Sequence, residues 1–290
     1  MERIKESELI INADGSIYHL SLKPGYLAEN VILVGDPGRV PKISRHFKKI
    51  EHKSQNREII VHTGIYNNLR LSVLSTGMGT DNIDIVMNEL DALVNIDFDK
   101  RQVKEKLTRL NIVRLGTSGS IQPEVPINSI IVSTHGIGMD GLLKYYSSES
   151  VIEKELTTAF IDQTHWHSYL PYPYIVSCSE VLLKKLGHDL QQGITATAPG
   201  FYGPQGRVIR LPLNHPDLME RIQKFNFNGK KVLNFEMETS ALFGLGKLLG
   251  HNTLTICAVI ANRATGEYTG NYQPVIENMI ELVLERITKS

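Results

Sequence analysis

The sequence predicts an α/β fold around a largely parallel sheet, because short apolar strands alternate with helices along the chain. Glycine-rich turns follow three of these strands, at residues 35–39, 76–80 and 114–119. Sheets of this kind bind ligands in the turns at the carboxyl ends of their strands. With 290 residues and 41% hydrophobic content, the chain can build one large domain or two smaller ones.

Charge and cysteine content narrow the class of protein. Lys and Arg together number 31, as do Asp and Glu, and no long basic run occurs, so we expect no nucleic-acid partner. Cys178 and Cys257 lie in apolar runs and are predicted to be buried free thiols, which favours a reducing compartment, the cytoplasm. No apolar run approaches about 18 residues and the N-terminus is charged, so neither a membrane span nor a signal peptide is expected.

The individual elements follow from local patterns. Apolar runs predict strands, at 9–12, 30–35, 57–61, 71–76, 129–133, 175–177, 193–198, 231–235 and 254–260. A further strand opens at Ile112. Helical patterns predict helices, at 82–93, 180–186, 239–249 and 273–287. Residues 94–108 are interpreted as a charged excursion before a short helix that leads to Leu110, and residues 134–150 as a loop.

Two of the turns carry an arginine. In the stretch 112–120, Arg114 ends an apolar strand, and Gly116, Thr117 and Gly119 follow. Glycines let a turn present its backbone N–H groups, and a guanidinium beside them suits an oxyanion such as phosphate. Arg39 stands in the second turn, next to a predicted helix N-terminus that also favours anions. An ordinary strand-to-helix turn with a surface arginine is the alternative.

Two further stretches predict polar recognition. The loop at 200–207 combines Phe201, Gln205 and Arg207, a set that a planar heterocycle with carbonyl groups needs. Its alternative is a surface loop with a packed phenylalanine. If 236–238 is extended, Glu236 and Glu238 face the same side and require a ligand or a cation to balance them. An acidic pair that caps the following helix is the alternative there.

Taken together, the motifs resemble those of the nucleoside phosphorylase family. In chain order they are GDPGR at 35–39, Arg57 at the start of a strand, STGMG at 75–79, RLGTSG at 114–119, FYGPQGR at 201–207, EME at 236–238 and NR at 262–263. The resemblance covers nearly the whole chain. It implies a single domain over 1–290, a three-layer α/β/α sandwich around a mixed, largely parallel sheet, and a homo-oligomer, dimer or hexamer, whose active sites lie at dimer interfaces.

The resemblance also implies roles for individual residues. Phosphate is bound by Gly35, Arg39, Arg114 and Thr117, with Arg57 supplied by a neighbouring subunit. Ribose is bound by His19 across the dimer interface and by Met237, Glu238 and, as a weaker candidate, Glu236. The base is bound by Ser118, Gly119, Phe201, Gln205, Arg207 and Arg263. Among these residues Arg114, Gln205 and Arg207 are expected to carry catalysis.

The implied reaction is the phosphorolysis of uridine to uracil and ribose 1-phosphate, without a cofactor, since phosphate is a co-substrate. Purine-cleaving members carry an aspartate where Asn262 stands, and the amide cannot protonate a purine. Purine nucleoside phosphorolysis, hydrolysis by water and non-catalytic nucleoside binding are the alternatives. Some members hold a monovalent cation between subunits through a glutamate where Glu58 stands and a serine where Asn82 stands. The presence of Asn82 instead of serine makes a bound cation doubtful. No other metal site is predicted, since CxxC and HExxH spacings do not occur.

Overall fold

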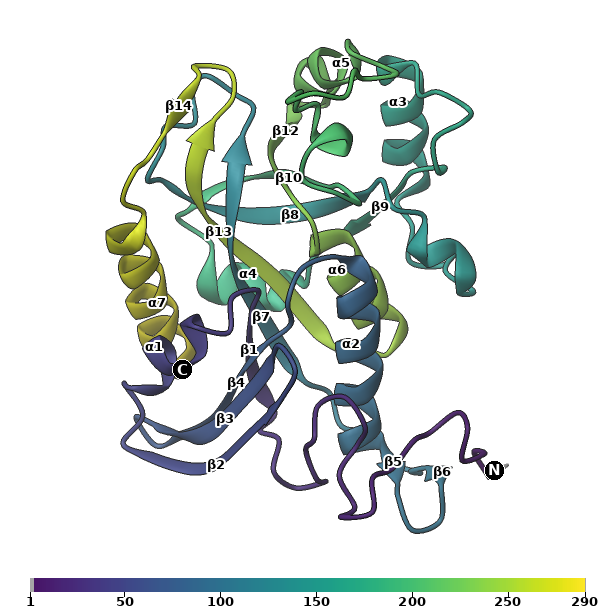
Figure 1. The fold of residues 1–290 in the computed structure, drawn as a ribbon, viewed down its shortest axis with the longest axis vertical. Helices are drawn as coiled ribbons and strands as arrows, with labels where there is room; N and C mark the ends of the chain where they lie inside the picture. The colour runs from purple at the N-terminus through teal and green to yellow at the C-terminus, as the bar shows by residue number, and fades with distance from the viewer. Residues whose placement is uncertain (1–2, 290) are drawn as a thin grey trace.

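A mixed sheet runs through the middle of the protein in the computed structural model, which describes residues 3–289 (Figure 1). Within these residues it has twelve strands, in the order β11-β12-β10-β8-β13-β7-β1-β4-β3-β2, with β9 beside β8 and β14 beside β13. The strands are β1 (Asn30–Val34), β2 (Lys49–Asn56), β3 (Ile59–Tyr66), β4 (Leu69–Ser75), β7 (Asn111–Ser120), β8 (Ile130–Gly138), β9 (Tyr174–Ser177), β10 (Gln191–Thr197), β11 (Asn226–Phe227), β12 (Lys230–Glu236), β13 (Asn252–Asn262) and β14 (Glu267–Tyr268). A separate pair consists of β5 (Ile96–Asp97) and β6 (Gln102–Val103).

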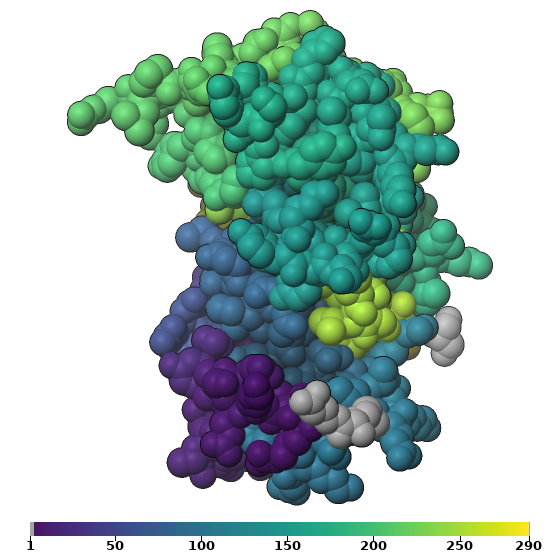
Figure 2. Space-filling view, turned by 90° about the vertical axis from the view of Figure 1, so that its right-hand side faces the viewer, coloured from purple at the N-terminus to yellow at the C-terminus, as the bar shows by residue number. Residues whose placement is uncertain are grey.

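Helices cover both sides of the sheet, so the prediction of an α/β/α sandwich around a mixed sheet is confirmed (Figure 1). The helices are α1 (Arg39–Ser44), α2 (Thr80–Asn95), α3 (Lys154–Thr164), α4 (Glu180–Leu186), α5 (Leu218–Lys224), α6 (Thr239–Leu248) and α7 (Gln273–Thr288), with short 3₁₀ turns η1 (Leu142–Tyr145) and η2 (Gly203–Gln205). Helix α2 packs against α6, and α4 packs against α7. Helices α3 and α5 lie together at one end of the molecule, and the N-terminal segment lies at the other end (Figures 1 and 2).

The centre of the sheet is buried because helices pack on it from both sides. The apolar residues 31–34 of β1 are fully buried between β4 and β7, with which β1 pairs in parallel. Buried side chains of α7 recur every three or four positions from Val275 to Ile287, so one face of the helix is apolar. Burial of such faces against the strands drives the layered arrangement.

Part of the sheet closes on itself, and this closure positions the site. Strand β12 pairs with β10 on one side and returns on the other to β7, where Asn234 lies opposite Ser120 and Phe235 lies opposite Gly119. The strands β7, β13, β8, β10 and β12 therefore form a ring. As a result the carboxyl end of β12 meets the second half of β7, although more than a hundred positions separate them in the sequence. The prediction of a turn at 114–119 is wrong, because these residues pair with β13 and continue the strand to Ser120.

Several predicted elements differ from the structure. The short helix predicted before Leu110 is absent from the described residues: 94–95 end α2, and 96–110 hold the β5–β6 pair and irregular chain. Strand β8 runs to Gly138 and η1 follows, in the stretch predicted to be a loop. Strand β2 and helices α3 and α5 have no counterpart among the predictions. Strand β2 is a polar edge strand, two of the four buried residues of α3 are threonines, and α5 buries only two residues, so none of them shows a strong apolar pattern. Between residues 3 and 289 we find no helix long and apolar enough to cross a bilayer.

Candidate active site

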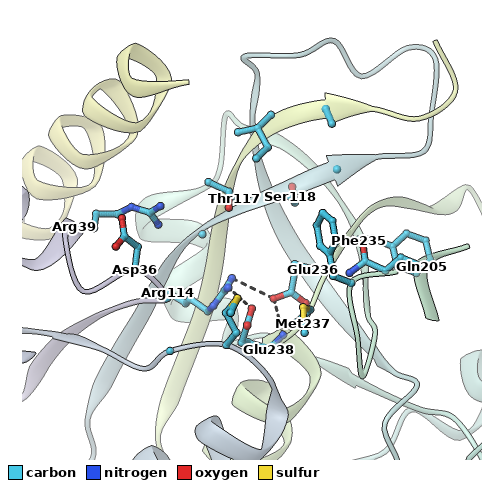
Figure 3. A pocket seen from close by; sticks show the side chains of 18 of the residues that line it. Asp36, Arg39, Arg114, Thr117, Ser118, Gln205, Phe235, Glu236, Met237 and Glu238 are labelled. Atoms are coloured by element: carbon cyan, nitrogen blue, oxygen red, sulfur yellow. Dashed lines mark hydrogen bonds and ion pairs between the residues drawn. The ribbon is translucent and has the colours of Figure 1, made fainter. Parts of the chain in front are cut away.

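A cavity of about 600 Å³ opens where β1, β4, β7, β12 and β13 end or turn (Figure 3). Motifs that lie far apart in the sequence line this one cavity. Its wall consists of Gly35, Asp36, Pro37, Arg39, Glu58, Gly77, Met78, Arg114, Gly116, Thr117, Ser118, Gly119, Phe201, Gln205, Arg207, Phe235, Glu236, Met237, Glu238, Ile260, Ala261 and Tyr268. Most of the predicted site residues are therefore brought together in one place.

One end of the cavity carries two guanidinium groups. Arg39, the first residue of α1, is buried, and its Nη1 donates to the Leu115 carbonyl at 3.0 Å. Burial lowers the pKa of Arg39, and the nearby Asp36 carboxylate partly opposes that effect. Thr117 lies near these two arginines (Figure 3), and Gly35, which precedes Asp36 in the chain, also lines the cavity. Two cations beside a hydroxyl suit a small polyanion better than a neutral ligand.

Arg114 connects this end with the acidic pair. Its Nη1 lies 3.2 Å from Glu236 Oε2 and 3.8 Å from Cys257 Sγ, and its Nη2 forms an ion pair with Glu238 Oε2. Burial opposes the charge of Arg114, but Glu238 and Glu236 together raise its pKa above the ordinary value. Gly116 is required beside it, because a Cβ there would lie 2.3 Å from Arg114 Nη1.

The two carboxylates play different parts. Glu236 accepts from the backbone N–H groups of Glu238 at 2.9 Å and Thr239 at 3.0 Å, so it caps the start of α6. Glu238 accepts from the Gly79 N–H at 2.8 Å and faces the cavity (Figure 3). Burial raises the pKa of Glu238 to about 7, with Glu236 adding to the rise and Arg114 opposing it. Both interpretations of the sequence hold, since the carboxylates face one side and one of them also caps the helix.

The loop 201–207 forms the opposite end. Gln205 is buried, and its Oε1 accepts from Arg207 Nη1 at 2.5 Å. The Arg207 guanidinium lies over the Phe201 ring at 3.9 Å and also donates to the Phe201 carbonyl at 2.7 Å. Burial lowers the pKa of Arg207, and the neighbouring Arg263 lowers it further. Arg207 donates to the oxygen of the Gln205 amide. The NH₂ group of Gln205 is therefore left to donate to a ligand.

The middle of the wall comes from β7 and the segment after β12. Ser118, Gly119 and Met237 line the cavity. The buried Ser118 hydroxyl has no hydrogen-bond partner within residues 3–289. A buried hydroxyl without a partner costs free energy unless a ligand or water satisfies it, so Ser118 supports a polar ligand here.

Three predicted site residues lie outside the cavity of their own chain. Arg57 is exposed between β2 and β3 with a left-handed backbone (φ 52°). His19 is held by Glu89, whose Oε1 lies 2.6 Å from the ring Nδ1. For both residues a contribution to a neighbouring subunit stays a prediction. Arg263 donates to the loop carbonyls of Gln205 and Gly206 instead of entering the cavity, so its contact with a base also stays a prediction.

Other wall residues have no counterpart among the predictions. Phe235, Ile260 and Ala261 belong to strands that were predicted, but an apolar strand residue carries no sign of which ligand it touches. Met78 and Tyr268 are exposed at the cavity. Met78 belongs to the STGMG motif, which did not single out this side chain, whereas only the fold brings Tyr268 there. Asp36 belongs to the GDPGR motif, which signals the turn and not this particular side chain.

The cation candidate and the two cysteines also lie in the described part of the chain. Within residues 3–289 we find no group of three or more His, Cys, Asp or Glu side chains placed to hold a metal ion. Glu58, the cation candidate, lines the cavity, and its Oε1 lies 3.4 Å from Asn82 Nδ2, which can donate to it. Cys178 and Cys257 are free and buried, as predicted, and burial raises the pKa of each thiol to about 12.

Comparisons with known proteins identify the family to which the chain is similar. The family model of the Phosphorylase superfamily matches residues 29–288. A uridine phosphorylase of Thermococcus kodakarensis is 31% identical over 274 residues, which cover 92% of this chain and 85% of that protein. A DeoD-type purine nucleoside phosphorylase of Bacillus cytotoxicus is 27% identical over 270 residues, covering 92% of this chain and 97% of that protein.

Among solved structures, a Trypanosoma brucei nucleoside phosphorylase that shows uridine phosphorylase activity superposes with a TM-score of 0.87 at 32% identity, covering 97% of this chain and all of that one. A purine nucleoside phosphorylase of Toxoplasma gondii superposes with a TM-score of 0.64 at 23% identity, covering 93% of this chain and 94% of that one, and this likeness concerns the fold alone.

Proposed function

The chain belongs to the phosphorylase superfamily, and from that premise we propose that it cleaves uridine with phosphate, giving uracil and ribose 1-phosphate. Its relatives place it with the nucleoside phosphorylases, which are pentosyltransferases. Nucleosides and phosphate are therefore its substrate classes. The choice of uridine among the nucleosides is our proposal.

One observation carries the proposal: a single cavity runs from a pair of guanidinium groups, past a carboxylate, to an amide and a third guanidinium. Phosphate fits the Arg39 and Arg114 end, where Thr117 adds a hydroxyl. Glu238 lies between the two ends and accepts from the ribose hydroxyls, and Met237 packs beside the sugar. Ser118, Gly119 and Phe201 flank the base, whose carbonyl oxygens face Gln205 and Arg207.

The chemistry follows from these placements. Phosphate attacks C1′ of the ribose while the bond to N1 of uracil breaks, and the electron pair of that bond leaves with the base. The negative phosphate balances the positive charge that develops on the sugar, so no protein nucleophile is needed. Orientation of two bound substrates supplies up to about 7–11 kcal/mol in favourable cases. Each donor placed at the oxygens of the departing uracil contributes about 3 kcal/mol.

The base assignment rests on Asn262 and on the loop 201–207. The buried Asn262 amide donates to the Gln122 carbonyl at 2.9 Å and to the Val125 carbonyl at 2.8 Å. Its oxygen accepts from the Ala264 N–H at 2.9 Å. An amide that holds the chain in this way has no proton to give to a purine N7. Gln205 and Arg207 instead offer neutral and cationic donors to the oxygens of a pyrimidine anion.

We also propose that the enzyme is a homo-oligomer in which His19 and Arg57 complete the active site of a neighbouring subunit. Both residues are at least partly exposed and lie outside the cavity of their own chain. In such an assembly, Arg57 adds a third cation to the phosphate end. His19 reaches the ribose 5′-hydroxyl.

The deciding experiment is a panel of nucleosides assayed with and without inorganic phosphate, with product identification. We expect uridine to be cleaved only when phosphate is present and ribose 1-phosphate to form in equal amount with uracil. Cleavage of inosine but not uridine would favour the purine alternative. Cleavage of uridine without phosphate would identify a hydrolase, and nucleoside binding without turnover would identify a binding protein.

A further inference from the structure

The carboxylate of Glu236 is fully occupied by the protein. Oε1 accepts from the Thr197 hydroxyl at 2.8 Å, and the Thr239 N–H is shared between Oε1 at 3.1 Å and Oε2 at 3.0 Å. Oε2 accepts from the Glu238 N–H at 2.9 Å and lies 3.2 Å from Arg114 Nη1. A carboxylate has about four acceptor positions, and these four donors fill them. Glu236 therefore has no acceptor left for a ribose hydroxyl, although it lies in the cavity wall.

Thr197, the last residue of β10, is the side-chain donor to Glu236 that comes from outside the cavity wall. It is fully buried, and its hydroxyl oxygen accepts from the Ser240 N–H at 2.9 Å. A hydroxyl has a single proton, so an oxygen that accepts from Ser240 directs this proton at Glu236. The direction of the hydrogen bond is thus fixed by the start of α6.

The start of α6 is itself held in place. The Ser240 hydroxyl donates to Asp140 Oδ2 at 3.2 Å, and the Tyr174 hydroxyl donates to Asp140 Oδ1 at 2.9 Å. Gly136 of β8 lets the helix approach, since a Cβ there would lie 2.8 Å from the Ser240 Cα. The position of Ser240 is therefore set by close packing on β8 and by the partly buried carboxylate of Asp140, and the Thr197 hydroxyl is connected to both through the Ser240 N–H.

We propose that Thr197 is a positioning residue for Arg114, acting through Glu236. Thr197 holds the Glu236 carboxylate in place, and this carboxylate holds the Arg114 guanidinium through Nη1. The N–H groups of Arg114 that are not paired within the protein can then donate to the anion. On this view Glu236 positions Arg114 and does not bind ribose. The inference rests on the proposed function in one respect, the assignment of phosphate to the Arg39 and Arg114 end.

The test compares Thr197→Val, which removes the hydroxyl at nearly constant volume, with Thr197→Ser, which keeps it. The control is Thr164→Val, since Thr164 is equally buried but donates to the Phe160 carbonyl within α3. Calorimetry measures the Kd for inorganic phosphate, and steady-state kinetics separates the KM for phosphate from the KM for the nucleoside. The thermal unfolding midpoint of each variant is recorded alongside.

We expect Thr197→Val to weaken phosphate binding about tenfold, the size of a lost hydrogen bond to a charged group, and Thr197→Ser to stay within about twofold of wild type. The KM for phosphate should rise more than the KM for the nucleoside. Thr164→Val should lower the unfolding midpoint without changing phosphate binding. If Thr197→Val does not fold, Thr197→Cys takes its place, because a thiol is a weak donor of similar size, and the same weakening is expected.

Equal phosphate affinity in Thr197→Val and Thr164→Val would overturn the inference, as would a Thr197→Ser variant as weak as Thr197→Val. The proposed function is tested separately by the wild-type enzyme alone, through its phosphate binding and its choice of nucleoside. The inference is judged only on differences between the variants and wild type, whichever nucleoside the wild type cleaves.

Discussion

The two ends of the cavity are built in different ways. The end that we propose binds phosphate and ribose consists of charged side chains from strands and the first residues of helices, and Arg39, Arg114 and Glu238 are buried and already paired. The end that we propose binds the base is the loop 201–207, where Phe201 is 51% exposed and Arg207 hydrogen-bonds to Phe201 and Gln205 of the same loop. Different nucleosides share a similar pentose and would use the same phosphate, whereas the base varies. The rigid end therefore suits the shared chemistry, and the loop suits the choice of base.

This comparison predicts that damage to the paired end costs both stability and activity. Arg114→Ala leaves Glu236 and Glu238 buried without their cation, which should lower the free energy of unfolding by about 3–5 kcal/mol. Phosphate-dependent turnover should be lost. Denaturant unfolding and phosphorolysis assays check the two effects.

The control for Arg114→Ala is Arg45→Ala, which removes an exposed ion pair with Glu277 and should change stability by less than about 1 kcal/mol. Adding Glu238→Gln to Arg114→Ala should restore part of the lost stability, because one of the two unpaired charges is then removed. An Arg114→Ala protein as stable as wild type would show that the acidic pair does not depend on this arginine.

At the base end, we expect loss of activity without loss of stability. Arg207→Ala removes a donor to the departing base, and kcat should fall by about 10²–10³-fold. Because Arg207 is only half-buried, the free energy of unfolding should change by less than about 1 kcal/mol. Arg210→Ala, a change to an exposed arginine of the same region, should leave both quantities unchanged. Unaltered kinetics in Arg207→Ala would remove this residue from the mechanism.

The raised pKa of Glu238 predicts a pH dependence of stability with a definite sign. Its pKa in the folded protein is about 7, above the ordinary value of 4.5, so the folded state keeps a proton that the unfolded state releases between these values. Stability from this group is full below about pH 4.5 and is lost as the pH rises through about 7. Glu238→Gln should therefore show a smaller fall in unfolding free energy between about pH 5 and pH 8.

The activity should change in the opposite direction. Since the ionised carboxylate is the better acceptor for ribose hydroxyls, kcat/KM of the wild type should rise through about pH 7. Glu124→Gln serves as the control, because Glu124 is exposed, its own backbone N–H and Lys231 lower its pKa, and it should not affect either profile. A wild-type profile that is flat between about pH 6 and pH 8 would contradict an essential Glu238 that titrates there.

The smallest expected effect concerns the support of the loop. Arg263→Ala removes donors to the carbonyls of Gln205 and Gly206, and the KM for the nucleoside should rise by about 3–10-fold. The KM for phosphate should not change, because the other end of the cavity does not touch Arg263. The nucleoside KM of Arg263→Lys should lie between those of wild type and Arg263→Ala, because an ammonium lacks the forked guanidinium that reaches both carbonyls. An equal rise in both KM values would mean that the two ends are not independent.

Local patterns predicted the central elements well. The apolar run of β1 and the periodic face of α7 depend on residues close in sequence, so both could be read from it. Helices α3 and α5 were missed for a physical reason. The buried face of α3 mixes two threonines with Leu156 and Phe160, and α5 buries only Leu218 and Ile222, so neither sequence carries a strong apolar repeat. Both helices gain stability from packing, in part against each other. The same holds for the polar edge strand β2.

The motifs predicted most of the cavity wall. Glycines, arginines and carboxylates grouped beside apolar strands form patterns that can be recognised in the sequence. Sequence reasoning left Glu236 with two interpretations, and the structure resolves its contacts: it caps α6 and meets Arg114 at once. Sequence reasoning could not predict the contact of Thr197 with Glu236. A threonine in an apolar strand has the same sequence context whether its hydroxyl donates to a carboxylate or to the backbone.

By itself, the sequence determined the layered α/β class, the glycine-containing turns after β1 and β4, and the kinds of side chain at each end of the cavity, because these depend on local periodicity and residue chemistry. Only the tertiary structure decided which of those side chains meet. The return of β12 to β7 places Glu238 against Arg114 across 124 positions of sequence. The packing of α6 on β8 decides the direction of the Thr197 proton. Such contacts depend on closure of the sheet, which no short stretch of sequence encodes.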